Sequence, residues 1–230
     1  MPKLSGQSMI CDASSLISLT DSCFIHALYF LRRKYKGKFI LPPSVEYECI
    51  THPMRMKAHS IYALRLRRAV NDGVLEVVPL PDPRLASEIR WTANSIFYSD
   101  GAPVRLLQDG ETEMLALAQQ IGVDNLLIDE RTTRMLAEDP DSLKQHLERE
   151  FHRPLTTNEE NLSSFRRMTR KMRFFRSSEL LLLAYEKGYF ADYGALELDA
   201  VEAALYRLKY AGCAVGMGEI ERHMAKHIRR

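Results

Sequence analysis

The stretch DGETEMLALAQQIGVDNLLIDERTTRMLAED, residues 109–139, predicts a helix, a strand and a second helix in immediate succession. The first helix has apolar residues at helical spacing; Asp109 is placed to cap its start, and Gly122 is placed to end it. The apolar run at 125–128 is too short for a helix and indicates a buried strand. Residues 131–139 return to a helical pattern. This order is typical of an α/β unit.

The same alternation extends toward the N-terminus of the 230-residue chain. Short apolar runs at 8–11, 38–41 and 74–80 predict three further strands, and helical patterns separate them. Strands that alternate with helices form parallel sheets covered by helices on both faces. The sequence therefore predicts an α/β fold with a central parallel sheet.

Composition excludes several classes of protein. The net charge of +2 gives no general affinity for nucleic acid, and the four cysteines form no CxxC pair that would indicate a structural zinc site. No run approaches the ~18 apolar residues of a membrane span, and the first residues lack the apolar core of a signal peptide. We therefore expect a cytoplasmic protein that does not enter a membrane.

Acidic residues follow the predicted strands, at the edge of a parallel sheet where ligands bind. These acids are Asp12 after the first strand, Glu46 and Glu48 after the second, Asp129 and Glu130 after the fourth, and Glu111 and Glu113 in the helix before it. Carboxylates that meet at one place favour a cation between them, and hard oxygen ligands suit Mg²⁺ or Mn²⁺. Taken alone, Glu46, Glu111 or Glu113 is more often a cap or a solvated charge, and Asp129 is at least as compatible with a turn or an N-cap. Asp12 is less easily explained in this way because its strand is apolar.

The chain resembles PIN domains, specifically a prokaryotic, VapC-type branch with helices after the nuclease core. The resemblance is carried by ICDASSLISL, LPPSVEYE, LQDGETEMLALAQQIGVDNLLIDERTTRMLA and LLLLAYEKGYF. It implies a three-layer α/β/α fold with about five parallel strands. It also implies a metal-dependent ribonuclease, of the kind that includes toxins of VapBC-type toxin–antitoxin pairs. We accordingly predict a PIN-like core at 1–150 and a helical extension at 151–230.

The resemblance also implies roles for individual residues. It makes Asp12 the first metal ligand and Ser14 the hydroxyl that supports it. Glu48 becomes the second acid because it lies three residues after Val45. Asp129 becomes the last acid, with Glu130 as a second candidate.

Two candidates remain for the third acid. Glu111 and Glu113 are two residues apart on a helix, so they point about 200° apart and only one can face the metal. Glu111 shares the face of Leu115 and Ala118, which we expect to be buried. We therefore prefer Glu111 and keep Glu113 as the alternative.

Basic residues supply candidate contacts to a nucleic acid. Arg131 and Arg134 follow the fourth strand and could meet a substrate phosphate, or could belong to a solvated helix face. The segment 163–178 has six basic residues and no acid, and its apolar residues show helical spacing. Its candidate phosphate contacts are Arg166, Arg167, Arg170 and Arg173.

Two functions follow from these observations. The first is a Mg²⁺- or Mn²⁺-dependent ribonuclease, which as a toxin would have an antitoxin partner. The second is a non-catalytic PIN-like module that binds RNA or another protein. The helices after the core suit packing, a homodimer or a protein partner.

Overall fold

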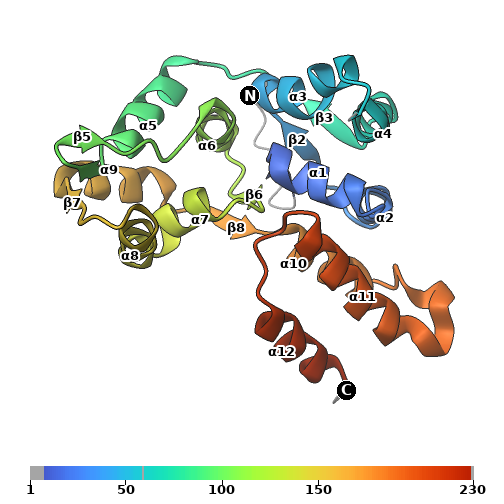
Figure 1. Ribbon diagram of the computed structural model, residues 1–230. Coiled ribbons are helices and arrows are strands. Elements are labelled where there is room, and N and C mark those ends of the chain that lie inside the picture. Colours follow the sequence, from blue (N-terminus) through green and yellow to red (C-terminus); the bar gives the residue numbers. More distant parts are fainter. Residues whose placement is uncertain (1–7, 59, 229–230) are drawn as a thin grey trace.

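A five-stranded parallel sheet lies at the centre of the molecule in the computed structural model, which describes residues 8–58 and 60–228 (Figure 1). The strand order is β3-β2-β1-β6-β8, and every neighbouring pair is parallel. The strands are β1 (Met9–Cys11), β2 (Phe39–Leu41), β3 (Leu75–Val77), β6 (Asn125–Leu127) and β8 (Arg173–Phe175). The predicted α/β fold with about five parallel strands is confirmed.

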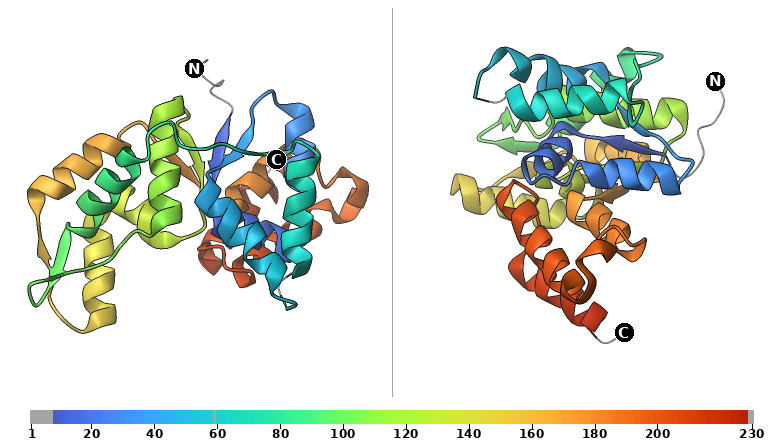
Figure 2. Two further views of the ribbon diagram at one scale, coloured as in Figure 1. Left: turned by 90° about the horizontal axis from the view of Figure 1, so that it is seen from above. Right: turned by 90° about the vertical axis from the view of Figure 1, so that its right-hand side faces the viewer.

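Helices cover both faces of this sheet, as Figure 2 shows from above. Successive side chains of a strand point to opposite faces, so Cys11 packs on one face and Ile10 on the other. The Cys11 face is covered by α1 (Ala13–Asp21), α2 (His26–Lys34), α3 (Pro43–Glu46), α4 (Ser60–Asn71), α10 (Ser177–Glu186), α11 (Glu197–Tyr210) and α12 (Met217–Ile228). The Ile10 face is covered by α5 (Arg84–Asn94), α6 (Asp109–Ile121), α7 (Arg131–Glu138), α8 (Pro140–Phe151) and α9 (Glu159–Thr169). Both faces are therefore apolar, as is usual for parallel sheets.

The order of the strands fixes where a ligand can bind. From β1 the chain builds outward through β2 to β3, and then returns to the other side of β1 with β6 and β8. The change of direction lies between β1 and β6, which pair through Cys11 and Leu127. In open α/β sheets the crevice at such a switch point, outside the carboxyl ends of the strands, is the usual binding site. Asp12 and Asp129 lie directly beyond these two strand ends.

A second, small antiparallel sheet lies beside α5 and α9 (Figure 1). It has the order β5-β4-β7, with β4 (Phe97–Ser99), β5 (Ala102–Pro103) and β7 (Thr156–Thr157). Residues 98–104 have a turn-like composition, and the structure makes them a hairpin. Asp100 and Gly101 both have positive φ, which is the requirement of a tight hairpin turn. Strands of two or three residues are too short to show an alternating pattern.

The basic segment 163–178 does not form a single amphipathic helix. It begins in α9, continues as β8 and ends in the first turn of α10. Phe174 and Phe175 pack on opposite faces of the sheet, which is the pattern of a strand. The region predicted as a helical extension, 151–230, thus supplies the fifth strand of the central sheet. The division into two domains after residue 150 stays a prediction.

Among the helices of residues 8–58 and 60–228, none is by itself long and apolar enough to cross a membrane. In the same described ranges, α1 and α2 taken together reach that length and composition, but the chain bends by 110° between them. Both contribute buried side chains, such as Leu16 and Leu28, to the core on the Cys11 face.

Candidate metal centre

Asp12 is buried at the switch point of the sheet. Its side chain is only 3% exposed, and its backbone N–H donates to the carbonyl of Leu127 (2.9 Å). Asp12 is also the N-cap of α1, because its Oδ2 accepts hydrogen bonds from Ser14 N (3.0 Å) and Ser14 Oγ (2.5 Å). In the described part of the chain, Oδ1 accepts no hydrogen bond. Asp12 therefore caps a helix with one oxygen and leaves the other for a ligand.

Glu48 and Glu111 lie close enough to Asp12 for their charges to act on it. Burial raises the pKa of Asp12 to about 7; the hydrogen bonds from Ser14 oppose this rise, and the charges of Glu111 and Glu48 add to it. Burial and the charge of Glu111 likewise raise the pKa of Glu48. We call Asp12, Glu48 and Glu111 the acid cluster. After burial, the charge of Glu111 contributes to the raised pKa of both Asp12 and Glu48, because like charges disfavour ionisation.

Local structure brings Glu48 into this cluster. Glu48 lies in a π-helical turn, Tyr47–Thr51, which continues α3; such turns are frequent at functional sites. Glu48 Oε2 lies 3.3 Å from the place where a Cβ on Gly110 would stand. The start of α6 therefore approaches Glu48 closely, and a larger residue at position 110 would crowd the carboxylate.

The N-terminus of α6 lies one residue earlier than the predicted cap, which changes the role of Glu111. The N-cap is Gln108, not Asp109, so Glu111 is the third helical residue. Glu111 Oε2 accepts a hydrogen bond from Gln108 N (2.9 Å), as in a capping box. Glu111 therefore helps to cap α6, and its charge also acts on Asp12 as part of the acid cluster.

The acid cluster has the donor chemistry of a divalent cation site. Three carboxylates supply hard oxygen ligands, and a cation between them would offset both the burial and the neighbouring charges that raise the pKa of Asp12. Across residues 8–58 and 60–228, no three His, Cys, Asp or Glu side chains stand together as a complete ligand set. The cluster thus fits Mg²⁺ or Mn²⁺ in chemistry, and Glu111 would have to turn from Gln108 N to contribute fully.

The two alternative acids make hydrogen bonds of their own. Glu113 Oε2 accepts from Ser44 N (3.2 Å) at the start of α3. Glu130 is the N-cap of α7, and its two oxygens accept from Thr132 N (2.6 Å) and Thr133 N (2.8 Å). Both side chains therefore satisfy helix N-termini.

Asp129 is buried next to Asp12, and its carboxylate points to α10. Its side chain is 1% exposed; Oδ1 accepts from Ser177 N (2.7 Å) and Oδ2 from Ser177 Oγ (2.7 Å). Asp129 N donates to Ser14 Oγ (3.2 Å), and Ser14 in turn donates to Asp12. Ser14 therefore connects the two aspartates. Ser177 was missed among the predicted site residues, although a serine that follows a strand at the start of a helix repeats the pattern of Ser14.

The candidate phosphate-binding arginines lie at different edges of the sheet. Arg131 and Arg134 belong to α7, which starts just beyond Asp129 at the carboxyl ends of the strands. Arg173 begins β8 in register with Asn125, at the opposite edge. The remaining three, Arg166, Arg167 and Arg170, are exposed, and Arg167 donates to the hydroxyls of Ser163 and Ser164.

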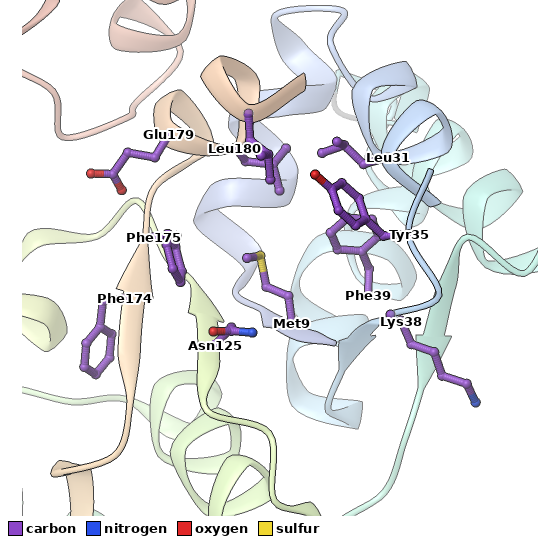
Figure 3. A pocket seen from close by; sticks show the side chains of 12 residues that line it. Met9, Leu31, Tyr35, Lys38, Phe39, Asn125, Phe174, Phe175, Glu179 and Leu180 are labelled. Carbon is purple, nitrogen blue, oxygen red and sulfur yellow. The ribbon is translucent and has the colours of Figure 1, made fainter. Parts of the chain in front are cut away.

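A separate cavity of about 510 Å³ opens at the amino ends of the strands (Figure 3). Most of its lining is apolar, including Met9, Leu31, Phe39 and Phe175. The same strands therefore present an apolar cavity at one edge and buried carboxylates at the other. Among the described residues, the carboxylate edge is where several acids gather for metal chemistry.

Comparison with known proteins identifies the family of this chain. A family model described as a PIN domain matches residues 8–141, more than half of the chain. No curated protein matches the chain. The matched segment contains the acid cluster and Asp129 but ends before Ser177. PIN domains are generally nucleases and generally use divalent metal ions. The resemblance to PIN domains seen in the sequence is confirmed, the VapC-type branch stays a prediction, and the chain belongs to the PIN domain family.

Proposed function

We propose that this protein is a metal-dependent ribonuclease that hydrolyses phosphodiester bonds of RNA with Mg²⁺ or Mn²⁺. The observation that supports it best is the acid cluster, three mutually repelling carboxylates at the switch point of a PIN-domain sheet. We propose Asp12, Glu48, Glu111 and Asp129 as the metal-holding residues. Glu130 is a weaker candidate because both of its oxygens accept from the start of α7. Glu113 is weaker because it accepts from Ser44 N, whereas the charge of Glu111 acts on Asp12.

Each residue has a role that follows from its contacts. A divalent ion, when bound, supplies Lewis-acid activation of water and stabilises charge on the scissile phosphate. Ser14 holds Asp12 through Oδ2 and leaves Oδ1 for the ion. Glu48 and Glu111 add the charge that makes a cation favourable at this place. Arg131 and Arg134, at the same edge, would contact the phosphates that flank the cleaved bond.

The first test concerns the metal. Titration calorimetry with Mn²⁺ should detect binding by the wild-type protein and little binding by Asp12→Asn. Glu130→Gln is the matched control, since it removes a neighbouring acid that caps α7. Equal binding by wild type and Asp12→Asn would remove Asp12 from the site.

The second test concerns the third acid. In a cleavage assay on single-stranded RNA, Glu111→Gln should reduce the rate far more than Glu113→Gln. The reason is that the charge of Glu111 acts on Asp12, whereas Glu113 bonds to the backbone of α3. The reverse ranking would assign the site to the other face of α6.

The third test separates binding from catalysis. Neutralising Arg166, Arg167, Arg170 and Arg173 should weaken RNA binding and lower the slope of log K against log salt by roughly 0.7 for each lost phosphate contact. Asp12→Asn should leave that slope unchanged and abolish turnover. An unchanged slope in the arginine variant would indicate packing or a protein partner for this segment.

A non-catalytic module that binds RNA or protein is the second candidate. It is favoured by the hydrogen bond that already engages Glu111, and by the lack of a complete ligand set in the described part of the chain. Wild-type protein that binds both Mn²⁺ and RNA without cutting the RNA would support this candidate.

We further propose a cytoplasmic protein of the VapC-type branch that acts as a toxin with an antitoxin partner. Light scattering on the purified chain would show whether it is a homodimer. A small neighbouring gene whose product copurifies with the chain and stops RNA cleavage would support the toxin role.

A further inference from the structure

The start of α10 contacts the candidate metal centre from outside the segment that the family model matches. Ser177 is the first residue of α10 and is fully buried. Its backbone N–H and its hydroxyl each donate a 2.7 Å hydrogen bond to a different oxygen of Asp129. The two residues are 48 positions apart in the sequence, so tertiary structure alone creates this contact.

A buried ion pair anchors this end of α10. Arg176, 5% exposed, donates to the carboxylates of Glu179 on α10 (2.9 Å) and Glu219 on α12 (2.9 Å), and to the carbonyl of Ala214 (3.0 Å). We call Arg176, Glu179 and Glu219 the arginine cluster. Because Arg176 precedes Ser177 directly, this cluster fixes the serine relative to the sheet.

We propose that Ser177 is a positioning residue of the metal centre, which it serves by orienting the carboxylate of Asp129. The inference rests on the proposed function, since it takes Asp129 as a metal ligand. A carboxylate oxygen has two lone pairs, so one hydrogen bond on each oxygen orients the group without filling its coordination sites. Hydrogen bonds to ligating carboxylates typically change metal affinity 10–100-fold.

The neighbouring serine provides a matched control. Ser178 is also buried, 3% exposed, and lies beside the thiol of Cys213. Replacing it by alanine removes a buried hydroxyl from the same helical turn without touching Asp129. Any general loosening of α10 would therefore affect both alanine variants.

The experiment is Mn²⁺ titration calorimetry on the full chain. Ser177→Ala should weaken binding about 10-fold or more. Ser177→Thr keeps a hydroxyl and should recover most of the affinity, and Ser178→Ala should bind as wild type does. Circular dichroism and thermal unfolding without metal would confirm that each variant is folded.

A double-mutant cycle tests whether the effect passes through Asp129. In an Asp129→Asn background, Ser177→Ala should cause little further loss of Mn²⁺ affinity. An equal loss in both backgrounds, wild-type affinity in Ser177→Ala, or equal weakening by Ser178→Ala would each overturn the proposal. Failure of the proposed function looks different, because then the wild-type protein itself would not bind Mn²⁺ or Asp12→Asn would bind it normally.

Discussion

The acid cluster and the arginine cluster use the same kind of side chain with opposite results. In the acid cluster, burial and neighbouring carboxylates raise the pKa of Asp12 to about 7. In the arginine cluster, the hydrogen bond from Arg176 lowers the pKa of Glu219 to about 2, against the opposing effect of burial. The difference lies in the cation, which the arginine cluster contains as a guanidinium group. The acid cluster consists of three carboxylates and no basic side chain, so a bound cation would offset their repulsion as Arg176 does in the arginine cluster.

The two clusters are also physically connected. Asp129 is linked to Asp12 through Ser14, and to the arginine cluster through Ser177, which follows Arg176 in the chain. The ion pairs of the arginine cluster therefore lie near a group of carboxylates whose charges repel one another. Changes that disrupt either cluster should therefore have opposite effects on stability.

The largest expected effect comes from removing the cation of the arginine cluster. Arg176→Met should lower the free energy of unfolding by about 3–5 kcal/mol, because it leaves two partly buried carboxylates without their partner. Urea unfolding without metal measures this loss. The control is Arg84→Met, whose ion pair with Asp82 is exposed and should matter far less. Similar losses of unfolding free energy in both variants would show that burial does not increase the contribution of the Arg176 ion pairs.

The acid cluster should respond in the opposite direction. Asp12→Asn keeps the shape and the Ser14 hydrogen bonds but removes a buried charge, so at pH 8 without metal it should stabilise the protein by about 2–4 kcal/mol. Urea unfolding of wild type and variant at that pH is the measurement. Asp139→Asn is the control, because Asp139 caps α8 at an exposed position. A destabilised Asp12→Asn would mean that the Ser14 donors already compensate the charge.

The pH dependence of stability follows from the raised pKa of Asp12. Between its ordinary value of 3.8 and about 7, the folded protein holds a proton that the unfolded chain releases. The stability that this bound proton contributes is fully present below about pH 4. It is lost as the pH rises toward 7, by up to about 1.4 kcal/mol per pH unit. Unfolding measured from pH 4 to pH 8 should show this slope in wild type and a smaller one in Asp12→Asn. Saturating Mn²⁺ should reduce the fall, since it replaces the proton.

The smallest expected effect on stability concerns Glu219, whose pKa is lowered. Its carboxylate contributes stability above about pH 4.5, and this contribution is lost as the pH falls toward 2. Glu219→Gln should therefore cost about 1 kcal/mol at pH 7, and the difference from wild type should shrink in acid. A constant difference from pH 7 to pH 3 would contradict the ion-pair explanation.

Much of the fold could be predicted from local patterns. Apolar runs bounded by acids, prolines or glycines predicted β1, β2 and β6, because strands buried on both faces are continuously apolar. The run that predicted β3 contains the exposed Glu76, so this strand is buried on one face only. Strand β8 was missed because its residues, RFF, include an arginine and follow a basic helix, so they do not stand out as an apolar run. The hairpin of β4 and β5 was missed because its strands, FYS and AP, form no continuous apolar run either.

The sequence by itself determined that acids follow the strands, because a parallel sheet places all carboxyl ends at one edge. Only the tertiary structure decided what each acid contacts. It made Gln108 the cap of α6 and thereby gave Glu111 a backbone partner, and it placed Glu113 against Ser44. It also brought Ser177 to Asp129. The physical reason is that a hydrogen bond between distant residues depends on how whole elements pack, and this leaves no periodic trace in the sequence.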